Sequence, residues 1–385
     1  MFVNMSVILF TGKATVKIQT VESKTDLKKF IYFPYQFYKD DPNWIPPLRA
    51  ELRNQFNPRT NPLLDHCDTC LFLLIREEQV IGRIAAFIDH RAVDFWKEKI
   101  GLFGYYECIP DKNASRTLLD AAEEWLREQG MDSMRGPWTF VSEEWGLVVE
   151  GFTPPPVIMS PYNPPYYDQQ LTAYGLGKAK DLLCYYMSGQ EGYQIPDRIL
   201  TLTDRVAKRY GVTVRPLEMK KYEEEVQIFL DLSNASIIDN WGYSPVTEAE
   251  AEAMAKDLKQ IIQPKGVVFA ENAAGKPIGF AAVLPDINTL LKGLNGRLLP
   301  FGWLKLLVGI PRLKNYRMFA LGVIPEYHGL GIDSLIYRAL YEFLYTPEIW
   351  MEINYVLEDN YPMINAIHKL NAKPLRRYRI YQRDL

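Results

Sequence analysis

The order of predicted elements constrains the fold most, because it occurs twice along the chain. Alternating apolar runs predict strands and 3.6-residue periodicity predicts helices. Each half gives the order strand, helix, three strands, helix, strand, helix, strand. In the first half we expect strands at 15–21, 71–76, 80–89, 101–109, 134–141 and 181–187, and helices at 25–38, 113–129 and 163–174. In the second half we expect strands at 212–219, 267–271, 277–284, 318–324, 350–356 and 375–382, and helices at 222–236, 328–345 and 360–370. The repeat indicates an ancient duplication. A polar linker near 188–196 predicts two domains, residues 1–190 and 191–385.

Composition excludes several classes of protein. The 44 basic and 47 acidic residues leave a net charge of −3, which argues against a nucleic-acid partner. Four cysteines in 385 residues cannot form a disulfide framework, so we expect a cytoplasmic protein. No apolar stretch reaches the roughly 18–20 residues that a membrane span needs. The apolar run at 7–10 follows no basic residue, which favours a short first strand over a signal peptide.

Residues 318–337 carry the most chemical information. A strand ending in Val323-Ile324-Pro325 runs into the turn 328–333, and an amphipathic helix follows. Glycines in a turn between a strand and a helix N-terminus allow several backbone N–H groups to converge on one point, where they and the helix dipole favour a phosphate. Taken alone, the turn is equally consistent with a tight connection that binds no ligand.

The spacing around this turn resembles the acetyl-CoA motif of the GNAT N-acetyltransferase family. In that motif a strand ending in a Val-x-Pro-like sequence precedes Gln/Arg-x-x-Gly-x-Gly/Ala. A second strand, an Asn, and a helix with a Lys near its end follow, as residues 351–356, Asn360 and Lys369 do here. The resemblance covers residues 212–385 by motif and the first half by element order. The chain is therefore identified as a tandem GNAT-like protein of the α+β class, with two mixed-sheet acyltransferase folds. The first half is expected to be degenerate, since its corresponding turn at 109–113 contains no glycine.

The resemblance implies an acyl-CoA-dependent N-acyltransferase whose site lies in the second half. The donor substrate would be acetyl-CoA or another acyl-CoA, with no metal. In this fold the fourth and fifth strands splay apart to admit the pantetheine arm. The residues expected to bind the cofactor are Leu321, Val323, His328, Gly329, Leu330, Gly331, Ile332, Asp333 and Asn360. Glu352 and Tyr355 are the candidate catalytic residues, and strand alternation predicts that they face opposite ways. The alternatives are a solvated strand glutamate and a core tyrosine.

Three departures from the family pattern keep other functions open. His328 replaces a Gln or Arg. Asp333 replaces a small residue, so it either repels a diphosphate or turns away to cap the helix. Ile367 stands where the family often has a tyrosine general acid. These departures motivate a second hypothesis, a non-catalytic ligand-binding protein on a decayed acyltransferase fold. A third is a peptidyl or aminoacyl transferase with a large donor such as charged tRNA, which the net charge disfavours.

The acyl acceptor is expected to be a small-molecule or peptide amine that the sequence does not name. Aromatic loops often wall ligand pockets, so Trp241 and Tyr243 with Tyr162 and Asn163 are its candidate binding residues. For the Pro-rich loop at 145–167, a rigid connection between the halves is the alternative. The insertion 289–314 carries only basic charges, so it could contact a membrane or bind an acyl chain. The preferred interpretation is a helical hairpin that packs over the protein. Cys67 and Cys70 form a lone C-x-x-C, which is weak evidence for a metal, and none is expected.

Overall fold

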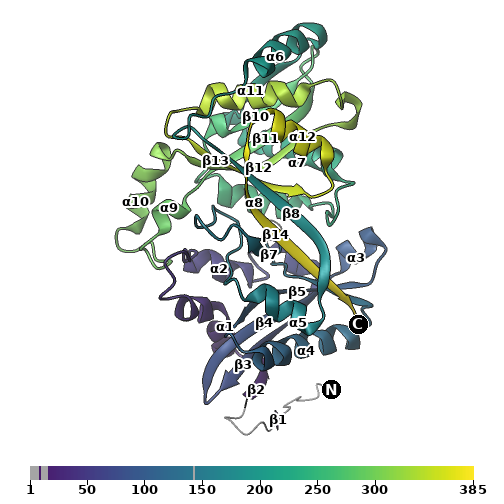
Figure 1. Cartoon of the computed structure of the whole chain (residues 1–385), viewed down its shortest axis with the longest axis vertical. Helices are drawn as coiled ribbons and strands as arrows, with labels where there is room; N and C mark the ends of the chain where they lie inside the picture. The colour runs from purple at the N-terminus through teal and green to yellow at the C-terminus, as the bar shows by residue number, and fades with distance from the viewer. Residues whose placement is uncertain (1–7, 10–15, 142–143) are drawn as a thin grey trace. The chain divides into compact units, whose positions relative to one another are not determined.

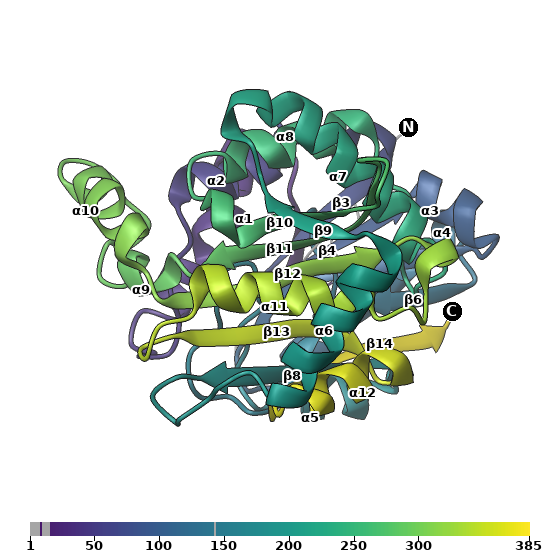
Figure 2. The ribbon, with the colours of Figure 1, turned by 90° about the horizontal axis from the view of Figure 1, so that it is seen from above.

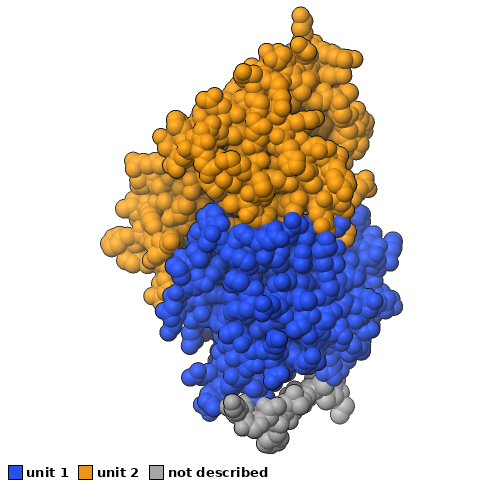
Figure 3. Space-filling model, viewed as in Figure 1, with its two compact units in different colours: residues 1–181, 377–385 blue, residues 182–376 orange. Residues whose placement is uncertain are grey.

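The computed structural model describes residues 8–9, 16–141 and 144–385, which form two compact units (Figure 3). Unit 1 comprises Met1–Asp181 together with Arg377–Leu385, and unit 2 comprises Leu182–Arg376. The chain thus leaves unit 1 at residue 181, before the division predicted at 190, and returns to it for its last nine residues.

Unit 1 is a sheet in the order β1-β2-β3-β4-β5-β6-β14, with β7 beside β14 (Figure 1). Its strands are β1 (Ile8–Leu9), β2 (Val16–Thr20), β3 (Cys67–Arg76), β4 (Gln79–Asp89), β5 (Ile100–Cys108), β6 (Ser133–Gly136), β7 (Leu147–Glu150) and β14 (Lys373–Asp384). Its helices are α1 (Lys24–Phe37), α2 (Arg49–Gln55), α3 (His90–Trp96), α4 (Lys112–Glu128) and α5 (Tyr167–Tyr174). Residues 7 and 10 of the expected first strand lie outside the described residues. The predicted apolar face of α4 is confirmed, since Leu118, Leu119 and Leu126 are fully buried against the sheet.

Unit 2 repeats the pattern in the order β8-β13-β12-β11-β10-β9. Its strands are β8 (Gly177–Ser188), β9 (Thr213–Pro216), β10 (Val267–Glu271), β11 (Pro277–Pro285), β12 (Asn315–Val323) and β13 (Trp350–Leu357). Its helices are α6 (Asp197–Tyr210), α7 (Tyr222–Ile237), α8 (Glu248–Leu258), α9 (Asn288–Leu291), α10 (Gly302–Gly309), α11 (Ile332–Leu344) and α12 (Tyr361–Lys369). Helices α6, α11 and α12 pack their apolar sides on one face of the sheet, and α7 covers the other (Figure 2). The predicted α+β fold class, with mixed sheet flanked by helices in each unit, is confirmed.

The last strands of the two halves are exchanged between the units. Strand β8, which ends the first half, pairs antiparallel with β13 in unit 2 from Trp350↔Ser188 to Leu357↔Leu182. Strand β14, which ends the chain, pairs antiparallel with β6 in unit 1 from Tyr381↔Gly136 to Asp384↔Ser133. Neither half therefore closes its sheet with its own last strand. Both strands carry the same kind of alternating pattern, and such a pattern does not specify the partner strand.

Several elements differ from their predictions for local reasons. The strand expected at 134–141 ends at Gly136, because Pro137 has no N–H to continue the ladder. Helix α6 begins directly after the region taken as a linker, with Pro196 at its N-cap. The 289–314 insertion contains the short helices α9 and α10. Within the described ranges, no helix has both the length and the apolarity of a bilayer span.

Candidate active site

Strands β12 and β13 separate at the centre of unit 2. They run parallel and pair in register from Asn315↔Trp350 to Met318↔Ile353, where their pairing ends. Beyond that point β12 continues along β11 as far as Val323, and β13 continues along β8 as far as Leu357. The facing edges of the two strands thus diverge, as the resemblance predicts for the fourth and fifth strands.

Bulges in both strands coincide with this separation. The register of β12 on β11 shifts between Met318 and Ala320, so that Phe319 is an extra residue. The register of β13 on β8 shifts between Ile353 and Val356. A bulge bends its strand and increases the local twist. Two bulges at the same level therefore turn β12 and β13 away from each other.

The open end of β12 leads into the glycine turn. After the 3-10 turn Pro325–Tyr327 come Gly329 and Gly331, both with left-handed φ values, of 74° and 81°. Gly331 is the N-cap of α11. A Cβ placed on Gly329 would meet no atom within 4 Å, so this side of the turn faces open space. The geometry matches a cradle in which backbone N–H groups approach an anion at a helix N-terminus.

His328 and Asp333 lie at the two ends of this turn. Nε2 of His328 donates to the carbonyl of Val323 at 2.7 Å and thereby braces the turn. Asp333 lies in the first turn of α11, whose N-cap is Gly331, so its side chain is not the N-cap of the helix. Burial raises the pKa of the Asp333 carboxyl, and the positive charge of Lys369 offsets only part of the rise.

Glu352 lies at the level where the strands separate and is completely buried. Its Oε2 is 3.9 Å from Nη1 of Arg376, also buried, and accepts a hydrogen bond from the Cys184 thiol at 3.6 Å. Within the described residues its Oε1 has no hydrogen-bond partner. Burial raises the pKa of Glu352, and the charges of Arg376 and Arg317 lower it by less. A carboxylate whose pKa is raised is a stronger base than an exposed glutamate, and the buried Glu352 is not the solvated strand residue of the alternative interpretation.

Tyr355 lies beside the same cluster. The Arg317 guanidinium stands 5.2 Å from the centre of the Tyr355 ring, and Arg317 is the register partner of Glu352. Simple alternation would put Glu352 and Tyr355 on opposite faces. The bulge between Ile353 and Val356 breaks that alternation and brings Tyr355 toward Arg317. Sequence reasoning missed Arg317, Arg376 and Cys184; a charged residue between the apolar Tyr316 and Met318 was the available signal for Arg317.

The other predicted cofactor residues occupy several environments. Leu321, Val323 and Leu330 are partly buried and pack against the core on the α11 side. Ile332 is 1% exposed and belongs to the core under α11. The Asn360 side chain caps α12 by accepting from the N–H of Met363 at 3.2 Å.

The predicted acceptor residues fall in different units. Trp241 and Tyr243 belong to the loop between α7 and α8 in unit 2, and the Tyr243 hydroxyl donates to Asn234. A Cβ on Gly322 would come within 2.6 Å of Ser236 Cβ, so the end of α7 that leads into this loop lies against the diverging end of β12.

Tyr162 and Asn163 belong to unit 1. The buried Asn163 exchanges two hydrogen bonds with the backbone of Val148, of 2.7 and 3.1 Å, and the Tyr162 hydroxyl donates to Asp41. Both side chains thus hold unit 1 together locally.

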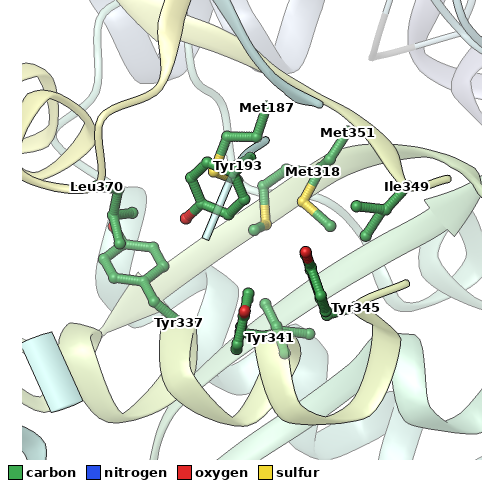
Figure 4. Close-up of a pocket in the computed structure, with 10 residues that line it drawn as sticks. Met187, Tyr193, Met318, Tyr337, Tyr341, Tyr345, Ile349, Met351 and Leu370 are labelled. Carbon is green, nitrogen blue, oxygen red and sulfur yellow. The ribbon is translucent and has the colours of Figure 1, made fainter. Parts of the chain in front are cut away.

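An apolar hollow lies on the α11 side of the unit 2 sheet (Figure 4). Its wall consists of tyrosines, methionines and aliphatic side chains: Met187, Tyr193, Met318, Tyr337, Leu340, Tyr341, Tyr345, Ile349, Met351 and Leu370. Met318 is the last residue of β12 that pairs with β13, so the hollow reaches the point where the strands part. The sequence analysis did not identify this hollow, because its residues come from distant segments.

Residues with metal-ligand chemistry meet in unit 1. His66, Cys67 and Asp89 place their ligand atoms within 4.8 Å of one another. The Asp89 carboxylate also accepts from His66 Nδ1 at 3.0 Å and from the N–H of Ala92 as the cap of α3. Cys70, the other cysteine of the C-x-x-C, is not part of this group, and burial raises the pKa of its thiol to about 12, which disfavours Cys70 as a thiolate ligand.

Comparison with known proteins adds relatives over nearly the whole chain, although no family model matches it. Protein YghO of Escherichia coli (strain K12) is 35% identical over 376 residues, covering 96% of this chain and 95% of its own. Bacterial ceramide synthase of Caulobacter vibrioides (strain NA1000 / CB15N) is 34% identical over 384 residues, covering 97% and 98%.

Solved structures agree on the fold. A tandem GNAT protein from the clavulanic acid biosynthesis pathway covers 96% of this chain and 98% of its own, with a TM-score of 0.56 and 12% identity. A GCN5-related glucosamine N-acetyltransferase region of a fungal multi-domain GH3 β-N-acetylglucosaminidase covers 97% of this chain and 38% of its own, with a TM-score of 0.58 and 13% identity. The tandem GNAT fold expected from the sequence is confirmed, and the chain belongs to the family that includes protein YghO and the bacterial ceramide synthase.

Proposed function

We propose that this chain is an N-acyltransferase that moves a long acyl group from an acyl-CoA thioester to the amine of a long-chain base. The observation that carries the proposal is the parting of β12 and β13 after Met318 and Ile353, with the glycine turn at the open end of β12. A parted strand pair offers backbone groups that can hydrogen-bond an extended pantetheine arm as an added strand. The turn offers N–H groups and a helix dipole to the diphosphate.

Glu352 is the general base of this proposal. The acceptor nitrogen attacks the thioester carbonyl, a C–N bond forms, and the C–S bond breaks to release the CoA thiolate. The proton lost by the amine passes to Glu352, directly or through a water molecule. Its burial and raised pKa make the carboxylate a stronger base than an exposed glutamate. The thiolate takes its proton from solvent, because Ile367, where the family often has a tyrosine, is buried in the core.

The hollow beside α11 has a volume of about 40 Å³, which admits the first few methylene groups of an acyl chain longer than the acetyl group that the sequence suggests. Its wall is almost wholly apolar, and it reaches the closed end of the strand separation (Figure 4). Each methylene group that such a wall removes from water contributes about 0.8 kcal/mol. The name of the Caulobacter relative, bacterial ceramide synthase, agrees with a long acyl chain, because a ceramide is the amide of a long-chain base with a fatty acid.

The acceptor site is assigned to the loop after α7, which carries Trp241 and Tyr243. The close approach of Ser236 to Gly322 brings this loop to the diverging end of β12. A cytoplasmic location is part of the proposal, since acyl-CoA is made inside cells and the four cysteines are free thiols.

A second function is favoured by one observation, the position of the Asp333 carboxyl in the first turn of α11, directly after the glycine turn. A negative charge there opposes a diphosphate. If that charge prevents donor binding, the chain is a ligand-binding protein on a decayed acyltransferase fold.

Release of CoA thiol from acetyl-, octanoyl- and palmitoyl-CoA, with sphinganine as the acceptor, tests the proposal. We expect turnover that increases with chain length, and a loss of roughly 100-fold or more in Glu352→Gln with little change in KM for the donor. Absence of amide product with every donor would overturn the acyltransferase assignment. Glu352→Asp, which keeps the charge, is the matched control. A thermal melt of each variant separates lost chemistry from lost folding.

A further inference from the structure

The segment 299–308 exposes an unusual amount of apolar surface. Eleven large hydrophobic side chains are exposed among the described residues, and six of them lie in these ten positions. The six are Leu299, Phe301, Trp303, Leu304, Leu307 and Val308, with exposures from 44% to 79%. Such clustering in one segment marks an interaction surface rather than scattered surface residues. The preferred interpretation of the sequence, that this insertion packs over the protein, is wrong for these side chains.

Local contacts hold the segment in a defined shape. A Cβ on Gly309 would lie 2.7 Å from Leu290, so α10 packs closely on α9 through this glycine. The Trp303 indole N–H donates to the carbonyl of Pro300 at 3.0 Å. Lys305 Nζ donates to the carbonyl of Lys292 at 3.2 Å. The two helices stand away from the sheet of unit 2, beyond the end of β11 (Figure 2). The apolar side chains are therefore presented outward by a structured element.

All the charges in and around this segment are positive. Residues 287–314 contain five basic residues and no acidic one. The five are Lys292, Arg297, Lys305, Arg312 and Lys314. The whole chain has a net charge of −3, so this concentration of positive charge is local. An apolar surface bordered only by basic groups is complementary to the surface of an anionic bilayer, with its phosphate headgroups above acyl chains.

We propose that the segment 299–308 docks this protein on an anionic lipid membrane. The apolar side chains enter the boundary between headgroups and acyl chains, and the surrounding lysines and arginines contact lipid phosphates. The eight residues of α10 are too few to cross the bilayer, so the contact is peripheral. A second copy of the chain is a poorer occupant, because two such faces would bring like charges together.

Vesicle flotation of the full-length protein, without donor or acceptor, tests this proposal. The vesicles are phosphatidylcholine alone, or phosphatidylcholine with about one third phosphatidylglycerol. We expect binding to the anionic vesicles that weakens as salt is raised. The double variant Phe301→Asp, Leu307→Asp should lose at least about 100-fold in partition coefficient, since each side chain contributes more than about tenfold when buried. Arg297→Ser and Arg312→Ser should each lower it about fivefold.

The matched control is Phe95→Asp with Leu202→Asp, which changes two exposed apolar side chains elsewhere and should leave vesicle binding unchanged. Equal binding by the Phe301, Leu307 variant and the unchanged protein would overturn the proposal. A second contradicting result would be that the unchanged protein binds no vesicles but sediments as a dimer, while the Phe301, Leu307 variant sediments as a monomer. The proposal does not rest on the acyl transfer proposed above, because binding is measured without substrate. Vesicle binding without turnover would overturn only the proposed function, and turnover of a water-soluble amine without vesicle binding would overturn only the docking.

Discussion

The two units use the same parting of parallel strands in different ways. In unit 1 the pairing of β5 with β6 ends after three positions, at Leu102↔Arg135, and in unit 2 the pairing of β12 with β13 ends after four. In unit 1 the chain itself fills the opening. The N–H of Trp138 donates to the carbonyl of Phe103 at 2.7 Å, and the N–H of Phe140 donates to the Tyr105 hydroxyl at 3.0 Å. The hydrogen-bonding groups that a pantetheine arm would use there are already satisfied.

The turns that follow the two parted strands also differ: the turn in unit 1 is filled by side-chain contacts, and the turn in unit 2 is open on one side. Between β5 and α4, Asp111 caps the helix by accepting from the N–H groups of Asn113 and Ala114, and it pairs with Arg76 at 2.7 Å. Between β12 and α11, a Cβ on Gly329 would meet no atom within 4 Å, so this side of the turn is open. The residue at the position of Glu352 differs as well. Glu352 belongs to the third pair between β12 and β13, and in the third pair between β5 and β6 its place on β6 is taken by Arg135. The two units thus share the parting of parallel strands, and it is in unit 2 that an open turn and the buried Glu352 accompany it.

The largest expected effect is that of blocking the turn in unit 2. Gly329→Trp fills the open side of the turn, and we expect a loss of at least about 100-fold in kcat/KM for the acyl-CoA. Gly329→Ala carries the same backbone strain at a left-handed φ but not the bulk of the indole. We expect it to lose much less of kcat/KM. The matched change in unit 1 is Lys112→Trp at the exposed start of α4, which should leave turnover unchanged. Loss of turnover in Lys112→Trp would show that unit 1 takes part in donor binding.

The second effect concerns the pH dependence set by Glu352. The base acts as a carboxylate, so turnover should fall as the pH drops through its pKa. Burial raises that pKa, and the fall should therefore begin at a higher pH than for an exposed glutamate, whose pKa is about 4.3. In Glu352→Gln we expect a residual rate that is roughly 100-fold lower and that no longer falls at acidic pH, because the titrating carboxyl is absent. A pH profile of kcat checks both statements. An unchanged acid limb in the variant would assign the titration to another group.

A smaller effect is expected from Asp333→Asn. Removing the negative charge beside the proposed diphosphate site should tighten acyl-CoA binding about fivefold, as calorimetry would show. Burial raises the pKa of Asp333, so its stabilising contribution is present at low pH and is lost as the pH rises through that pKa. The variant should therefore melt no lower than the unchanged protein at pH 7. Weaker binding in the variant would show that Asp333 assists the donor.

The smallest effect is expected from the corresponding aspartate of unit 1. The hydrogen bond from Arg76 lowers the pKa of Asp111, so its contribution is present above the usual pKa of about 3.9 and is lost as the pH falls through the lowered value. Asp111→Asn keeps a capping side chain and loses the ion pair, at a cost of roughly 0.2–1 kcal/mol in the free energy of unfolding. Chemical denaturation at pH 7 measures this cost. Acyl-CoA affinity should not change, and a change would contradict the assignment of the donor to unit 2.

Local sequence signals located most of the elements that build the site. The amphipathic pattern of 113–129 and the apolar run of 318–324 became α4 and β12 with shifts of at most three residues at each end. The glycine spacing at 329 and 331 located the turn. These features depend on neighbouring residues alone, so they can be read from a single sequence.

The remainder depends on contacts between distant residues. The residues around Glu352 in the sequence do not predict its contacts with Arg376 and Cys184. The residues around Met318 do not predict the hollow that Met318 lines together with Tyr193 and Tyr345. The bulge that turns Tyr355 toward Arg317 arises only when β13 pairs with β8. The outward exposure of Phe301 and Leu307 was also undecidable, because an apolar helix has the same pattern whether protein or lipid covers it.

The sequence by itself determined the repeated order of strands and helices, the glycine turn, and the positive charge of residues 287–314, since each of these is a property of consecutive residues. Only the tertiary structure decided that β8 and β14 exchange units, that a chain segment closes the strand opening of unit 1, and that Glu352 is buried beside an arginine. Those outcomes depend on which surfaces meet after the chain has folded, and side-chain alternation along a strand carries no information about the partner strand.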